Sequence, residues 1–213
     1  ERTTLLRNAP HVAQPLAFVM PSYKWWETPG YGLGLVLYDL LAGKAGLGKT
    51  RFLGRDSALA ALPGVNPSGL KGGVKYWDGQ FDDARLAITL AKTAAQAGAL
   101  LVNYCPVEEL QYTDGKVSGL RCRDAETGQS IAVQARCVIN ATGVWVDALR
   151  HKDGEVTVPA GGKPVRDMVA PSQGVHLVVD AEFLGSDVAL MVPKTADGRV
   201  LFAVPWLGKV ILG

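Results

Sequence analysis

The order of the patterns in the middle of the chain constrains the fold most. A helix is expected over "ARLAITLAKTAAQAG" (residues 84–98), and a buried strand is expected over "ALLVNYCPV" (residues 99–107). A helix that leads into a buried strand is half of a parallel crossover unit. The turns Asp114-Gly115 and Thr127-Gly128 then predict a three-stranded antiparallel meander, and the apolar strand "RCVINATG" follows. The expected class is therefore α/β.

The segments before this unit predict a helix, a loop and a strand. "MPSYKWWETPG" (residues 20–30) is rich in Pro and aromatic residues and indicates irregular structure. A strand is expected around Val74 to Trp77, and Asp82 or Asp83 is expected to cap the next helix. Between them, five residues at helical spacing form one apolar face that ends at Gly43; they are Leu33, Val36, Leu37, Leu40 and Leu41.

Composition excludes several classes of protein. The net charge is +2 and no run of Lys and Arg occurs, which argues against nucleic acid as a partner. The three cysteines show no metal-binding spacing, so no metal is expected. The most apolar run, "YGLGLVLYDLLAG", contains Asp39 and is too short to span a bilayer, although it is compatible with a membrane surface. The chain begins in a helical pattern and stops in a strand pattern, so we expect it to be incomplete.

The stretch "GKAGLGKT", from Gly43 to Thr50, matches the spelling of a phosphate-binding loop. A working loop of this kind leaves a buried strand and enters a helix, so that its N–H groups converge on the phosphates. Here the pattern predicts a helix before the loop, and Gly54 interrupts the segment that should form the helix after it. We therefore interpret the stretch as a loop between two helices, with a triphosphate-binding enzyme as the less favoured alternative.

The small residues of "NATG" are the first chemical signal. In open α/β sheets, ligands bind at the carboxyl ends of parallel strands. Ala141, Thr142 and Gly143 allow the main chain to approach a cofactor closely, whereas an ordinary tight turn is the alternative. The meander before this strand favours a fold that binds flavin adenine dinucleotide (FAD).

Four stretches in this order resemble the FAD-dependent glycerol-3-phosphate dehydrogenases and the related α-glycerophosphate oxidases. They are "KYWDGQFDDARL", "VINATGVWVD", "PSQGVHLVVD" and "DGRVLFAVPW". The resemblance implies a membrane-associated flavoprotein that oxidises sn-glycerol 3-phosphate to dihydroxyacetone phosphate and passes electrons to quinone, or to oxygen in the oxidases. Val144 stands where many relatives carry Pro.

The resemblance also implies an arrangement of domains. Residues 1–80 would hold a helical segment and the start of a substrate domain built on an antiparallel sheet. Residues 81–148 would be part of the Rossmann-like FAD domain, and residues 149–213 would supply further strands of the substrate domain.

Site residues follow from the resemblance where the motifs match. The backbone of Val107 would meet the adenine ring, Ala141, Thr142 and Gly143 would line the dinucleotide, and Trp145 would pack close to it. His176 resembles the active-site histidine beside the flavin and the substrate. Imidazole suits this role because it titrates near neutral pH and can accept the proton that a secondary alcohol loses when its hydride leaves.

Three alternatives stay open at this level. An amino-acid or sarcosine-type oxidase shares the sheet plan, a phosphate-loop NTPase would use Lys49, and the fragment could be a binding module without activity of its own. The expected location is the cytoplasmic face of the inner membrane, or the mitochondrial inner membrane in a eukaryote. The oligomeric state is open, a homodimer included.

Overall fold

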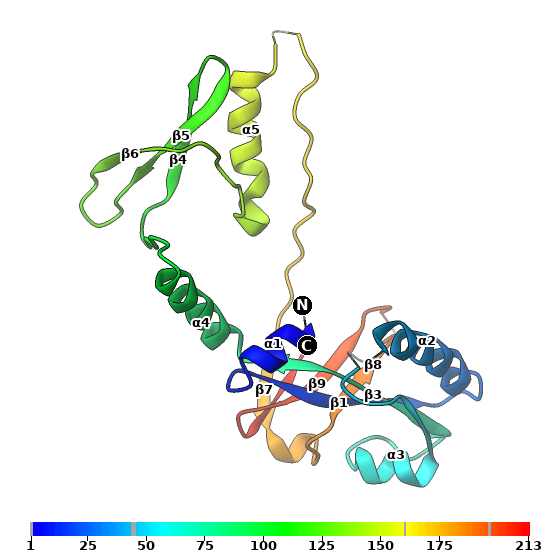
Figure 1. Cartoon of the computed structure of the whole chain (residues 1–213). Coiled ribbons are helices and arrows are strands. Elements are labelled where there is room, and N and C mark those ends of the chain that lie inside the picture. The colour runs from blue at the N-terminus through cyan, green and yellow to red at the C-terminus, as the bar shows by residue number, and fades with distance from the viewer. Residues whose placement is uncertain (1, 44–45, 160, 196) are drawn as a thin grey trace. The chain divides into compact units, whose positions relative to one another are not determined.

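A computed structural model describes residues 2–43, 46–159, 161–195 and 197–213 (Figure 1). The chain divides into two compact units, each described by itself. Unit 1 comprises Glu1–Leu90 and Gly174–Gly213, and unit 2 comprises Ala91–Gln173. The assignment of residues 81–148 to FAD and of the flanking stretches to substrate concerns function, and it stays a prediction.

Unit 1 is built on a seven-stranded sheet in the order β2-β3-β1-β8-β9-β10-β7. Every neighbouring pair is antiparallel except β1 and β8, which run parallel through Phe18↔Ala189 and Val19↔Leu190. An antiparallel sheet was expected in these parts of the chain, and its role as a substrate domain stays a prediction. The strands are β1 (Ala13–Ser22), β2 (Arg51–Gly54), β3 (Gly72–Phe81), β7 (Leu177–Asp180), β8 (Ala189–Val192), β9 (Leu201–Trp206) and β10 (Lys209–Leu212).

The long strand β1 was not predicted, because proline is rare within sheets. Pro15 and Pro21 lie in β1, and "MPSYKWWETPG" is therefore only partly irregular. The pairing explains how the prolines are tolerated. β3 pairs with β1 along its whole length, but β8 pairs only with Phe18 and Val19, so both prolines lie outside the doubly paired stretch.

One face of the unit 1 sheet is covered and forms the core. Val19, Ala203 and Val210 point to this face and pack against Leu62 and Leu184. Leu62 directly follows helix α3 (Arg55–Ala61), and Leu184 directly follows the short 3-10 helix η3 (Ala181–Phe183). These five side chains are at most 4% exposed, so they remove their apolar surface from water almost completely.

Helices α1 (Arg2–Asn8) and α2 (Glu27–Ala42) complete the N-terminal part of unit 1. The predicted apolar helix and its end are confirmed, since the N–H of Gly43 bonds to the carbonyl of Asp39. The inner side of α2 carries Gly32, which meets the ring of Phe52, and Asp39, which accepts a 2.6 Å hydrogen bond from the N–H of Thr50. Its predicted apolar face points the other way and is largely exposed.

The stretch "GKAGLGKT" connects α2 to β2. Residues 44 and 45 of this stretch lie outside the described residues. In the part that the structure describes, a helix leads in and a strand leads out, which is the reverse of the order that a phosphate-binding loop requires. The interpretation as a connecting loop holds, although it joins a helix to a strand and not two helices.

Helix α4 (Asp83–Gln96) contains the boundary between the units, which falls after Leu90. Both of its ends match the sequence signals. The Oδ1 atom of Asp82 accepts a 3.0 Å hydrogen bond from the N–H of Arg85, and Gly98 closes the helix with a φ of 91°. The predicted N-cap and C-terminal glycine are therefore confirmed.

Unit 2 holds the predicted antiparallel meander. Its strands are β4 (Val107–Thr113), β5 (Lys116–Arg123) and β6 (Ser130–Gln134), in that order. The β4–β5 turn has φ values of 51° at Asp114 and 74° at Gly115, as a two-residue hairpin loop requires. Helix α5 (Val146–Thr157) follows the one-turn 3-10 helix η2 (Gly143–Trp145), and Tyr112 Oη donates a 2.6 Å hydrogen bond to Asp153 that ties α5 to β4.

The α/β class is confirmed, but the two predicted buried strands of the FAD domain are wrong for this chain. Residues 99–106 and 136–142 form no strand, and Leu100 and Ile139 are 91% and 83% exposed. The expected half of a parallel crossover is therefore absent from the described residues. A strand persists only where a neighbour exchanges hydrogen bonds with it, and in the described part of the chain neither segment belongs to a sheet.

Candidate functional site

The turn after residue 139 is shaped by the side chain of Asn140. Its Oδ1 atom accepts hydrogen bonds from the N–H of Thr142 at 3.3 Å and from Thr142 Oγ1 at 2.8 Å. Its Nδ2 atom donates to the carbonyl of Val146 at 3.0 Å. An asparagine that bonds to the backbone two residues further on is a common way to fix a tight turn. Asn140 therefore fixes the path of Ala141, Thr142 and Gly143 into η2.

The outer side of this turn can accept a ligand against the main chain. Gly143 has a φ of 59°, a conformation that side chains rarely adopt, and a Cβ atom built on it would meet no atom within 4 Å. Trp145, at the end of η2, is 73% exposed. The turn thus presents bare backbone with a free indole on the same short element, which fits the predicted contact with a dinucleotide.

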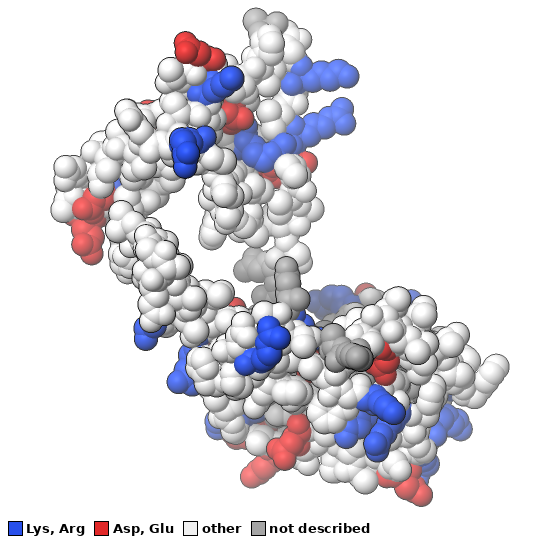
Figure 2. Space-filling view, viewed as in Figure 1, with Lys and Arg blue, Asp and Glu red and all other residues white. Residues whose placement is uncertain are grey.

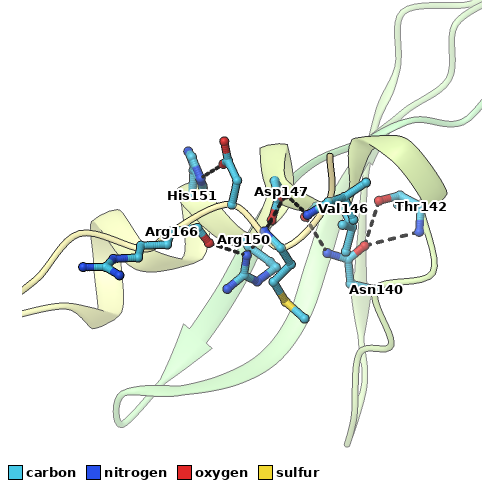
Figure 3. A network of polar contacts seen from close by, with 10 residues as sticks. Asn140, Thr142, Val146, Asp147, Arg150, His151 and Arg166 are labelled. Carbon is cyan, nitrogen blue, oxygen red and sulfur yellow. Dashed lines mark hydrogen bonds and ion pairs between the residues drawn. The ribbon is translucent and has the colours of Figure 1, made fainter. Parts of the chain in front are cut away.

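Asp147 connects the turn to a distant segment of unit 2. Its carboxylate accepts hydrogen bonds from the N–H groups of Met168 and Val169, both at 2.9 Å from Oδ2, and it forms an ion pair with Arg150. Arg150 in turn donates a 2.8 Å hydrogen bond to the carbonyl of Arg166. Figure 3 shows these contacts side by side with the Asn140 contacts, at the start of α5. We call residues 166–169 the strap.

The hydrogen bonds around Asp147 favour its ionised form. The N–H of Val169, followed by that of Met168 and by Arg150, lowers the pKa of Asp147. The carboxylate is therefore the form that holds the strap. A further contact joins the same two elements, since His151 Nε2 lies 2.9 Å from Asp167 Oδ1. Polar contacts thus join the turn, α5 and the strap to one another.

Val107 lies in the same unit, as the first residue of β4. It is 39% exposed, so its backbone and side chain are partly open to a ligand. Next to it, Glu108 pairs with Arg123 at 2.6 Å, and this contact lowers the pKa of Glu108. The predicted adenine contact at Val107 is compatible with this position and stays a prediction.

His176 lies in unit 1, directly before β7, and its side chain is exposed. Alternation along the strand places it on the same face of the sheet as Val178, opposite to the face that forms the core. The first residue of β7 pairs with the last residue of β10. His176 therefore lies at the end of the strands that is opposite to the β9–β10 turn. A Cβ atom built on Gly213 would lie 2.1 Å from its Cδ2 atom, which shows that the ring lies over the main chain of Gly213.

Aromatic side chains continue along this second face of the sheet. Phe18 stacks on Tyr76 with a centroid distance of 5.2 Å and meets Phe202 edge-on at 6.2 Å. Tyr76 Oη donates to Met191 Sδ at 3.0 Å, and burial, followed by the nearby charge of Asp78, raises the pKa of Tyr76 to about 12. This tyrosine therefore keeps its proton at neutral pH.

The structure brings together part of the predicted site. Ala141, Thr142, Gly143 and Trp145 share one turn of unit 2, and Val107 belongs to the same unit. His176 belongs to unit 1, so its approach to the flavin remains a prediction. Sequence reasoning did not identify Asn140 and Asp147 individually, although both stand in the quoted motif "VINATGVWVD".

Two other kinds of site are absent from the described residues. None of the described helices is long and apolar enough to cross a membrane. Within the same residues, no group of three or more His, Cys, Asp or Glu side chains is arranged to hold a metal ion. On the face seen in Figure 2, both basic and acidic side chains lie on each of the two units.

The comparison with protein families defines the class. The model of the family "FAD dependent oxidoreductase" matches residues 5–213, so the chain belongs to this family. Among its relatives, the mitochondrial glycerol-3-phosphate dehydrogenase of Macaca fascicularis is 42% identical over 219 residues, which cover 100% of this chain and 29% of that protein. The chain thus spans less than a third of that relative. The expectation of an FAD-dependent oxidoreductase similar to the glycerol-3-phosphate dehydrogenases is confirmed.

Solved structures agree with this assignment. The glycerol-3-phosphate dehydrogenase from Bacillus halodurans, complexed with FAD, matches 100% of this chain and 36% of its own with a TM-score of 0.73 and 30% identity. Glycine oxidase from Geobacillus kaustophilus matches 100% of this chain and 51% of its own with a TM-score of 0.66 but only 20% identity, so it shares the fold alone.

Proposed function

We propose that this chain is part of an FAD-dependent glycerol-3-phosphate dehydrogenase, which oxidises sn-glycerol 3-phosphate to dihydroxyacetone phosphate. One observation carries the proposal: the entire chain matches enzymes of that name in sequence, at 42% identity, and in fold, at a TM-score of 0.73. The amino-acid oxidases share the fold at much lower identity. They are therefore the less favoured candidate.

The residues of unit 2 are proposed to hold the cofactor. FAD, when bound, supplies a hydride acceptor. The turn that Asn140 fixes offers bare main chain at Gly143 to the dinucleotide, and Trp145 packs beside it. Val107, at the start of β4, offers its backbone to the adenine ring.

His176 is proposed to handle the proton in the same reaction. When the hydride leaves C2 of glycerol 3-phosphate, the hydroxyl group on that carbon must lose its proton. A nitrogen of the His176 imidazole takes this proton. The reaction balances without a metal, because carbon gives up two electrons with the hydride and oxygen gives up one proton.

Quinone is the proposed electron acceptor, and the protein is proposed to bind a membrane surface. Support comes from α2, whose exposed side carries Leu33, Leu37, Leu40 and Leu41, with Trp25 81% exposed just before the helix. A helix with leucines on its open side and tryptophan at its start suits a membrane interface. The relatives' names specify mitochondria, and the mitochondrial inner membrane is the location we propose. The cytoplasmic face of a bacterial inner membrane is the alternative location.

A substrate panel tests the proposal. The full-length protein that contains these residues is purified with its flavin and mixed anaerobically with sn-glycerol 3-phosphate, glycerol, glycine or sarcosine. Loss of the oxidised flavin absorbance with glycerol 3-phosphate alone is the expected result. Reduction by glycine or sarcosine, with none by glycerol 3-phosphate, would move the assignment to the amino-acid oxidases. A quinone analogue then restores the oxidised spectrum if quinone is the acceptor.

A further inference from the structure

A row of residues crosses the face of the unit 1 sheet opposite the core and ends at His176. Phe202 of β9 pairs with Met191 of β8. Phe202 and Gly213 exchange two backbone hydrogen bonds, at 2.6 and 3.0 Å, which extend the β9–β10 ladder by one residue. The His176 ring lies next to Gly213 from the other side. Gly213 is therefore the position between an imidazole and a phenyl ring.

A side chain at this position would collide with the imidazole. A Cβ atom on Gly213 would lie 2.1 Å from Cδ2 and 2.7 Å from Nε2 of His176, and the third nearest atom is Cγ of the same ring. The three closest obstacles thus belong to one side chain. Gly213 is not among the glycines with a positive φ, so its backbone would accept alanine. The His176 ring is therefore the nearest obstacle to a side chain at this position.

We propose that Gly213 is a positioning residue for His176. Its bare main chain forms the seat on which the imidazole rests, so that the ring leans across β10 towards Phe202. A methyl group at residue 213 fills the seat and moves the ring off it. The catalytic consequence rests on the proposed function, in which His176 takes the hydroxyl proton, whereas the contact itself does not depend on it.

A double-mutant cycle in the full-length protein tests the contact. The variants are Gly213→Ala, His176→Ala and the combination of both, with Gly174→Ala as the matched control, because a Cβ atom on Gly174 meets nothing within 4 Å. Gly213→Ala should lower the midpoint of thermal unfolding in the wild-type background but not in the His176→Ala background, where the ring is gone. Gly174→Ala should leave it unchanged.

Turnover provides the second reading. Gly213→Ala should lower kcat about tenfold or more while KM changes less, because a base displaced by about 1 Å loses its alignment. The same substitution should have no further effect in the His176→Ala background. Added imidazole should raise the turnover of His176→Ala, and it should do so less in the double variant, where the methyl group occupies part of the seat.

The outcomes separate the inference from the proposed function. Independent, additive effects of the two substitutions on the unfolding midpoint and on kcat would refute the proposal that Gly213 positions His176. Coupling in unfolding together with wild-type turnover of His176→Ala would support the contact and refute the role of His176 as the base. Coupling in both measurements supports the positioning role in full.

Discussion

Two single side chains matter most for the proposed function, His176 and Asp147, and they differ in how their surroundings hold them. His176 is exposed at one edge of a sheet and has no acidic partner among the described residues that would orient it. Its placement comes from strand alternation and from the glycine beside it. Asp147, by contrast, is held by several donors at once. The two residues therefore differ in what their removal should do.

Replacing His176 by alanine should lower the turnover of the full-length enzyme with glycerol 3-phosphate at least about tenfold, since a general base usually contributes about 10²–10⁴-fold. Steady-state kinetics with a dye acceptor measures the effect. His11→Ala is the matched control, because His11 lies just before β1, in another strand region of the same unit. Wild-type turnover in His176→Ala would remove this residue from the mechanism.

Replacing Asp147 by asparagine should release the strap. Asparagine offers one acceptor oxygen where the carboxylate offers two, so its amide nitrogen must face either Arg150 or the N–H groups of Met168 and Val169. Because either choice weakens the contact and removes the negative charge, these two N–H protons should exchange with solvent at least about tenfold faster. Hydrogen exchange followed by mass spectrometry over residues 161–173 measures the change. Asp167→Asn is the control, because it removes the same charge from the strap without touching those bonds. Equal exchange in both variants would contradict the role of Asp147.

The same contact predicts a pH dependence. The pKa of Asp147 is lower in the folded chain than its ordinary value of about 4, because the folded state stabilises the carboxylate. The contribution to stability is therefore complete above about pH 4 and is lost as the pH falls through the folded value. Asp147→Asn should abolish this part of the acid sensitivity of the strap, and hydrogen exchange of the strap measured along a pH series checks it.

For single residues, the sequence indicated the functional motif but not the contacts that its residues make. The motif "VINATGVWVD" contains Asn140 and Asp147. Its small residues predicted close approach of the main chain to a cofactor; Gly143 leaves space for this, and the contact itself stays a prediction. The strap partners Met168 and Val169 lie in a segment without periodicity, and a hydrogen bond from backbone N–H leaves no mark on the identity of the donor residue. For that reason the network could not be read from the sequence.

Elements whose signals are local were predicted correctly. α2 and α4 follow helical spacing and caps, and the β4–β5 hairpin follows from Asp114-Gly115. Strands that depend on distant partners were predicted less well, although the strand expected around Val74 to Trp77 lies within β3. Residues 99–106 have the composition of a buried strand but no pairing in the described chain, whereas β1 contains two prolines and is a strand because β3 pairs with its whole length.

Helix α2 carries the membrane prediction at this scale. Leu37 and Leu41 are 57% and 81% exposed, and their replacement by serine together should weaken binding to phosphatidylcholine vesicles with a minor share of anionic lipid by about tenfold or more. Co-sedimentation measures the bound fraction. The control is Leu90→Ser in α4, where the leucine is 60% exposed on another helix. Equal losses in the two variants would argue against a membrane role for α2.

At the scale of the whole molecule, the chain holds two units that serve one proposed reaction. The cofactor contacts are assigned to unit 2 and the proton acceptor to unit 1. Apolar residues of the two unpaired segments are exposed, among them Leu100 and Ile139. The chain spans 29% of its macaque relative, so most of the surface that contacts FAD in a complete enzyme is expected from other residues.

The isolated chain of residues 1–213 should therefore bind FAD at least about a hundredfold more weakly than the full-length protein, since loss of about 3 kcal/mol of contacts already has this effect. Quenching of flavin fluorescence on titration measures the affinity. A solution of the chain should also brighten a hydrophobic dye more than the full-length protein does. Tight, stoichiometric flavin binding by the isolated chain would show that unit 2 is sufficient.

The parallel pairing of β1 with β8 has a consequence for biosynthesis. The first strand leaves the ribosome early, but the partner for its second edge follows only after unit 2 has been made. Until then that edge is open to pairing with another polypeptide, while the meander, whose strands are sequence neighbours, has time to form. A nascent chain that stops before Ala189 should accordingly keep this edge of β1 unpaired and available for aggregation.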